Sequence, residues 1–175
     1  MRPSNNPSGF KFLRTWSQAN EILELLEKFV PTLPARNPVT SHPLTDLKDH
    51  MQRSMRSVIR NIEEGYARTS THEYISFLGF SLGSLEELIG DLEFCREKRI
   101  GDQEILAKLI RLCHGEAMML NNQIKALEKK RLESGNISER EHAKLIVDRQ
   151  KKDEFDQEKF LAEIREKYLK GKHGF

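Results

Sequence analysis

Hydrophobic residues recur at steps of three and four over four stretches of the chain, which is the spacing of one face of an α-helix. The two clearest stretches lie in the middle of the chain, separated by a short turn. The first contains Leu47, Met51, Met55, Val58, Ile62 and Tyr66. The second contains Tyr74, Phe77, Leu78, Ser81, Leu85, Leu88, Leu92 and Cys95. The pattern predicts two amphipathic helices, each of which buries one face.

Local signals predict where these two helices end and begin. Gly65 stands near the end of the first, where a residue without a Cβ atom can take the left-handed conformation that closes a helix. We therefore expect this helix to end around Tyr66 or Ala67. Ser70 and Glu73 form a capping box, in which a hydroxyl and a carboxylate satisfy free backbone N–H groups at the start of the next helix.

Two further helices flank this pair. The first is expected from about residue 10 to 30, and four prolines make residues 31–44 a connection without helix. The last follows a turn at Gly101 and Asp102, and its stripe consists of Ile105, Leu109, Leu112, Glu116, Leu120, Ile124 and Leu127. Glu116 interrupts this stripe, and an unpaired buried charge is costly, so we place it at the bundle edge ahead of a buried polar contact.

The pattern as a whole predicts an all-α fold, an antiparallel up-down four-helix bundle with a helical C-terminal extension. Residues 1–9 are polar and contain two prolines, which is typical of a disordered leader. Residues 10–133 make up the bundle. Residues 134–175 form a charged helical tail whose thin apolar seam cannot bury a core of its own. That tail is either a solvated appendage or a helix that docks on a partner.

Composition limits the classes of function. The 175 residues include 29 Lys and Arg against 27 Asp and Glu, a formal net charge of +2, so any basic surface must be local. No apolar run approaches the roughly 18 residues that span a bilayer, and the first residues lack the apolar segment of a secretion signal. We expect a cytoplasmic protein without a membrane partner. Cys95 and Cys113 are expected to be buried and reduced, and a disulfide between helices remains the alternative.

The clearest local basic surface lies on the first of the two central helices. Arg53, Arg56 and Arg60 cluster within roughly 60° of one another, opposite the apolar stripe. Arg68, at the helix end, extends this candidate nucleic-acid-binding surface. Acidic residues three or four positions from the three arginines make a solvated salt-bridge face the alternative, and they are Asp49, Glu63 and Glu64.

Three glycines share one face of the next helix, nearly opposite its apolar stripe. They are Gly79, Gly83 and Gly90. Glycine inside a helix costs about 1 kcal/mol relative to alanine, so their alignment favours close approach of another backbone. We expect an oligomer interface there, and tolerated glycines on a solvated face are the alternative.

The chemical signatures in the sequence do not amount to an active site. Residues 79–83 match the G-x-S-x-G pattern, but Ser81 lies in mid-helix with no strand before it. Glu139 and His142 give one Glu-x-x-His motif, whereas a di-iron bundle needs two on core helices and further glutamates. We therefore expect no catalytic residue, no metal and no cofactor.

The central helices also resemble a known family. The segments that carry the resemblance are Ser57, Asn61-Ile62-Glu63-Glu64-Gly65, Ser70-Thr71-His72-Glu73-Tyr74 and Gly83-Ser84-Leu85-Glu86-Glu87-Leu88. With Trp16 in the first helix, they are similar to the four-helix-bundle proteins typified by the 23S rRNA intervening-sequence proteins, over about residues 10–130. This chain departs from the family pattern at Glu63, where the family has alanine.

The resemblance implies antiparallel four-helix protomers that assemble as a pentamer. Accessory proteins of diversity-generating retroelements share the fold group, and those bind nucleic acid and a reverse transcriptase. Two hypotheses follow. The first is a non-enzymatic oligomeric bundle that binds structured RNA or RNA/DNA, as an accessory subunit of a reverse transcriptase. The second is a protein–protein scaffold whose tail recruits a partner, without nucleic-acid binding.

Overall fold

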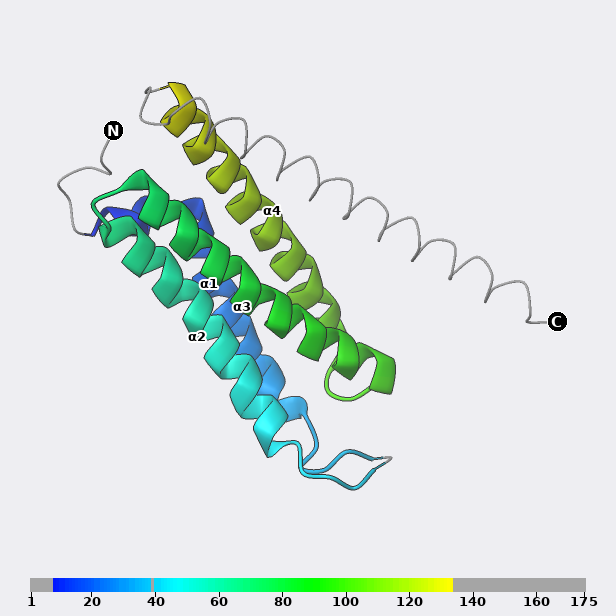
Figure 1. Cartoon of the computed structure of the whole chain (residues 1–175). Helices are drawn as coiled ribbons and strands as arrows, with labels where there is room; N and C mark the ends of the chain where they lie inside the picture. The colour runs from blue at the N-terminus through cyan, green and yellow to red at the C-terminus, as the bar shows by residue number, and fades with distance from the viewer. Residues whose placement is uncertain (1–7, 39, 134–175) are drawn as a thin grey trace, which may run out of the picture. The chain divides into compact units, whose positions relative to one another are not determined.

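A computed structural model describes residues 8–38 and 40–133 of the chain (Figure 1). Its four α-helices are α1 (Arg14–Phe29), α2 (Thr45–Ala67), α3 (Thr71–Lys98) and α4 (Gln103–Glu133). Two short 3-10 helices, η1 (Gly9–Phe12) and η2 (Val30–Thr32), flank α1. Figure 1 shows that consecutive helices run in opposite directions, and the described residues contain no β-strand. The predicted all-α four-helix bundle is thereby confirmed.

The predicted leader and the predicted tail lie largely outside the described residues. Residues 1–7 of the predicted leader and the whole predicted tail, residues 134–175, lie outside the described residues. Gly9, which we assigned to the leader, begins η1 and is buried. The hydrophobic core belongs to the first of two compact units in the chain, Met1–Lys129.

The core is formed by the apolar stripes that the periodicity identifies. All four helices contribute fully buried side chains, which include Ile22, Leu26, Phe29, Met51, Met55, Ile62, Leu78, Leu85, Leu88, Leu92, Leu106 and Leu109. Removing this apolar surface from water is the main force that holds the helices together. Cys95 and Cys113 are buried free thiols, so the disulfide alternative does not apply. Burial raises the pKa of both thiols to about 12.

The turn between α2 and α3 matches the local signals closely. Ala67 is the last residue of α2, and Ser70 caps α3 with its Oγ atom accepting a hydrogen bond from the Glu73 backbone N–H at 3.2 Å. The same hydroxyl donates to the Glu73 carboxylate at 2.7 Å. The first helix is shorter than predicted, because Leu13 is extended (φ −76°, ψ 131°) and separates η1 from α1.

Gly65 has a different role from the predicted one. It is a buried residue within α2, and its φ is not positive, so the prediction of a left-handed helix end was wrong. A Cβ atom at this position would lie 2.7 Å from the Cβ of Phe77 and 2.9 Å from Cδ2 of Tyr74. Glycine is therefore required by the close approach of α3. A left-handed helix end occurs at the next turn instead, where Arg99 (φ 52°) and Gly101 (φ 77°) have positive φ.

Glu116 is also placed differently from the prediction. Its side chain on α4 is fully buried, and neither carboxylate oxygen has a hydrogen-bond partner among the described residues. The expectation of a bundle-edge position was wrong, because the buried face of α4 continues across position 116 from Cys113 to Leu120. Loss of hydration raises the pKa of Glu116 from 4.5 to about 8, so the neutral acid predominates at pH 7. Protonation reduces the cost of burying this group.

Candidate nucleic-acid interface

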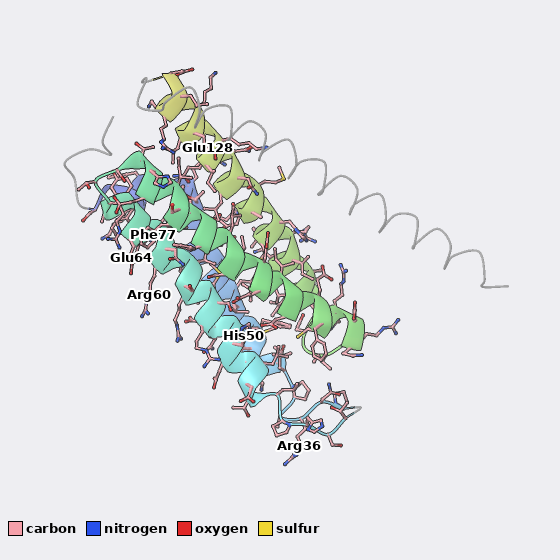
Figure 2. All side chains as sticks on the ribbon, viewed as in Figure 1. Arg36, His50, Arg60, Glu64, Phe77 and Glu128 are labelled. Carbon is pink, nitrogen blue, oxygen red and sulfur yellow. The ribbon has the colours of Figure 1, made fainter. Side chains whose placement is uncertain are left out.

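The arginine stripe on α2 is exposed along its length. Arg53, Arg56 and Arg60 all face solvent, while Met51, Met55 and Ile62 on the opposite side of the helix are fully buried. Figure 2 shows Arg60 pointing outward from α2, away from the other helices. Steps of three and four place the three guanidinium groups on one side of the helix. They can therefore contact one continuous ligand.

These three arginines are not neutralised by ion pairs. Within the part of the chain that the structure describes, none of them forms a salt bridge. Two of the acidic residues expected to pair with them have other partners. Glu63 accepts a hydrogen bond from Trp16 Nε1 at 2.8 Å, and Glu64 pairs with Arg68 at 3.6 Å. The salt bridges of the alternative are therefore absent at Arg53, Arg56 and Arg60 in this region, whereas the pair of Glu64 and Arg68 is present at the end of α2.

Arg68 differs from the other three candidate residues. It is exposed at the C-terminal cap of α2, where it pairs with Glu64 and lies over the ring of Phe77, 4.5 Å from the ring centroid. A cation held over an aromatic face is attracted by the ring's quadrupole. Arg68 thus has two protein partners, and we assign it a supporting position at the end of the stripe.

A polar seam follows the outer contact between α2 and α3. His50 Nδ1 lies 2.6 Å from the Asp91 carboxylate, and the Ser54 and Ser57 hydroxyls contact Glu87 at 3.4 Å and Ser84 at 2.9 Å, respectively. Because α2 and α3 are antiparallel, the contacts advance by four and then three residues along α2 while they go back by four and then three residues along α3. Extended by the same steps, this register puts Asn61 level with Phe80 and Glu64 level with Phe77. The close approach of Gly65 to Phe77 agrees with this extension. Figure 2 shows Glu64 and Phe77 on these two adjacent helices.

Asn61 supports the contact between α2 and α3 indirectly. Its side-chain amide donates to the Ser57 hydroxyl within α2 at 3.2 Å, and Ser57 in turn accepts from Ser84 on α3 at 2.9 Å. The contact between the helices is therefore made by the two serines. Asn61 holds one of them in place from one turn away.

Two aromatic residues of α3 lie at the end of this seam. Phe77 and Phe80 are packed edge to face, with ring centroids 5.7 Å apart and an interplanar angle of 83°. Phe77 is half-buried, whereas Phe80 remains 60% exposed. Phe80 is not among the residues that the sequence pattern singled out. Its position outside the apolar stripe of its helix is the signal that would have identified it.

The glycine face of α3 is open. Gly79, Gly83 and Gly90 are exposed, and a Cβ atom added at any of them would have no neighbouring atom within 4 Å. Packing within the described part of the chain therefore does not explain these glycines. Their assignment to an oligomer interface stays a prediction.

The geometry does not support the hydrolase motif. Ser81, the central residue of the G-x-S-x-G match, is fully buried in α3, and its hydroxyl donates to the Val58 carbonyl oxygen at 3.0 Å. A nucleophile needs an accessible hydroxyl and an adjacent base. Among residues 8–38 and 40–133, no group of three His, Cys, Asp or Glu side chains is arranged to hold a metal ion. Glu139 and His142 lie outside the described residues.

The helices of the described region do not have the character of membrane segments. None of them combines the length and the apolar composition needed to cross a bilayer.

Comparison with known proteins assigns the chain to a family. No curated protein matches it. The sequence model of the 23S rRNA-intervening sequence protein family matches residues 13–122, which run from the start of α1 into α4 and include the whole of α2 and α3. This family is not a known family of enzymes. Because the match covers more than half of the sequence, and the fold is the expected helical bundle, the chain belongs to the 23S rRNA-intervening sequence protein family.

Proposed function

We propose that this protein is a non-enzymatic, oligomeric helical bundle that binds structured RNA or an RNA/DNA hybrid through the arginine stripe of α2. The observation that carries the proposal is the presence of three exposed guanidinium groups, at Arg53, Arg56 and Arg60, without an ion pair among the described residues. Exposed arginines that lack acidic partners are suited to phosphate, because their planar N–H groups match its oxygens.

The stripe of a single protomer is too small for tight binding. Three phosphate contacts correspond to a slope of only about −3 in a plot of log affinity against log salt. The net charge of +2 adds no long-range attraction. Repetition by oligomer symmetry would present several stripes to one nucleic acid and multiply the contacts. The proposed binding therefore depends on assembly.

The open glycine face of α3 supports such assembly. Gly79, Gly83 and Gly90 carry no Cβ atom on the side of α3 opposite the core, so a helix of another subunit can approach closely at these three positions. A pentamer is the subunit number that the family resemblance implies. A reverse transcriptase is the protein partner proposed for the assembled particle.

Nucleic-acid binding is tested by fluorescence anisotropy with a labelled RNA hairpin and a labelled RNA/DNA hybrid, between about 50 and 200 mM salt. The double variant Arg56→Ala plus Arg60→Ala should bind more weakly, with a salt slope less steep by about 1 for each arginine that binds a phosphate. The matched control, Lys108→Ala plus Arg111→Ala, removes two exposed positive charges from α4 and should bind like the wild type. Absence of binding at the lowest salt would reject the proposal in favour of the scaffold hypothesis.

The subunit contact is tested by light scattering. Gly83→Arg places a long charged side chain on the glycine face and should lower the molar mass in solution. The control, Ala107→Arg, introduces the same residue at an exposed position of α4 and should leave the mass unchanged. Equal masses for the two variants, with helix content preserved in circular dichroism, would remove the glycine face from the proposed interface.

A further inference from the structure

Phe80 is an aromatic residue exposed without a packing role in the core. Only three large hydrophobic side chains are exposed among the described residues, namely Phe12, Phe80 and Met118. Of these, Phe80 alone lies on α3 at the outer contact with α2, beside the helix that carries the arginines. A single exposed apolar side chain is ordinary on a protein surface, but this ring lies beside a basic stripe, where its face is open to a ligand with an apolar face of its own.

The ring of Phe80 is held in place by its neighbours. Phe77 packs against it edge to face, and Arg68 lies over Phe77 while also pairing with Glu64. These contacts restrict the ring of Phe80 without covering it, since 60% of this residue stays accessible to solvent. A positioned aromatic platform loses less entropy on binding than a free side chain does.

The register of α2 and α3 brings this platform next to the arginine stripe. Phe80 is level with Asn61, which directly follows Arg60 in α2. The axes of packed helices lie about 8 to 10 Å apart. A single strand can therefore place phosphates on Arg56 and Arg60 and a nearby base on Phe80.

We infer that Phe80 stacks on an unpaired nucleobase, and that the ligand of this surface is a single-stranded stretch, loop or bulge of RNA. The inference rests on the proposed function and specifies its substrate class. A continuous duplex keeps its base faces stacked on one another and offers only phosphates and groove edges to the protein. Away from the ends of a duplex, only an unpaired base presents a free aromatic face to a phenyl ring. Arginines alone do not distinguish the two forms, whereas the aromatic residue does.

The experiment compares two RNA probes with equal numbers of phosphates. One is a hairpin whose loop carries 2-aminopurine, and the other is a blunt duplex. Phe80→Ala should lower the affinity for the hairpin by about fivefold to a hundredfold, the effect of removing one stacked base. Its affinity for the duplex and its salt slope should stay at the wild-type values, because the arginines that bind phosphate are unchanged. Phe80→Tyr retains the ring and should restore hairpin binding and the quenching of 2-aminopurine fluorescence.

Two further variants serve as controls. Phe80→Leu keeps an apolar side chain without the aromatic face, and it should bind the hairpin nearly as weakly as Phe80→Ala. Met118→Ala removes a side chain that is 67% exposed on α4 and should have no effect on either probe.

Three outcomes would overturn the inference: equal reductions in affinity for both probes, wild-type binding by Phe80→Leu, or a lower subunit number for Phe80→Ala in light scattering. The last would assign Phe80 to a subunit contact. The experiments distinguish failure of this inference from failure of the proposed function. If the arginine double variant shows the expected change in salt slope while Phe80→Ala binds like the wild type, only the stacking inference is rejected. If the wild-type protein binds neither probe, both are rejected.

Discussion

The buried carboxyl group of Glu116 makes the stability of this protein depend on pH in an unusual direction. An acid whose pKa is raised by folding binds its proton more tightly in the folded state. The pKa of Glu116 rises from 4.5 to about 8 because burial removes the charged form from water. Between these two values the unfolded chain has released the proton and the folded protein has kept it. Raising the pH through this range therefore destabilises the folded state, and the effect levels off above pH 8.

The size of the effect follows from the two pKa values. Each pH unit within the range costs about 1.4 kcal/mol at room temperature. Between pH 5 and pH 9 the contribution of Glu116 to the free energy of unfolding should fall by about 4 kcal/mol. Single domains are stable by about 5 to 15 kcal/mol, so the decrease is a large part of the total.

The perturbation that isolates this contribution is Glu116→Gln. Glutamine has nearly the same shape and the same need for hydrogen bonds, but it does not titrate. Urea unfolding is followed by far-ultraviolet circular dichroism at a fixed protein concentration from pH 5 to pH 9. The difference in unfolding free energy, wild type minus variant, should decrease by about 4 kcal/mol over this range. Glu86→Gln, at an exposed position of α3, provides the matched control and should show no such trend.

A difference between wild type and Glu116→Gln that does not change with pH would contradict a raised pKa of Glu116 in the folded state. A gain in the stability of the wild type relative to the variant as the pH rises would contradict it equally, since that would mean a carboxylate stabilised by an opposite charge. A pH trend shared by Glu86→Gln and the wild type comes from other groups, and the subtraction removes it.

Three further predictions test the packing of the bundle. Gly65→Ala should lower the free energy of unfolding by about 1 to 3 kcal/mol, because the new methyl group collides with Phe77. Urea titration measures this decrease, and an unchanged midpoint would contradict the close approach of the helices. Trp16→Phe should cost about 1 to 3 kcal/mol in the same assay, since it removes the hydrogen bond to the Glu63 carboxylate; a variant as stable as the wild type would show that this bond contributes nothing. The two buried cysteines should react with an aromatic disulfide reagent at pH 8 only after unfolding, and fast labelling of the native protein would refute their burial.

The sequence alone determines the helical architecture of this protein. Helical periodicity, the Ser70 capping box and the proline-rich connection are local properties, because each depends on residues within one or two turns of each other. Helical periodicity also places Arg53, Arg56 and Arg60 on the solvent face of α2. Four helices and an exposed basic stripe are therefore available before any tertiary information.

Tertiary structure alone decides which partners the side chains have. Trp16 donates a hydrogen bond to the Glu63 carboxylate from 47 positions away in the chain, and no local rule predicts that contact. The approach of α3 explains Gly65, and the packing around α4 buries Glu116. The register between α2 and α3 puts the exposed ring of Phe80 beside the stripe. The helical period determines on which face of a helix a residue lies. The rotation of the neighbouring helices about their axes, and their shift along those axes, determine which side chains that face contacts. These depend on the packing of all the helices together.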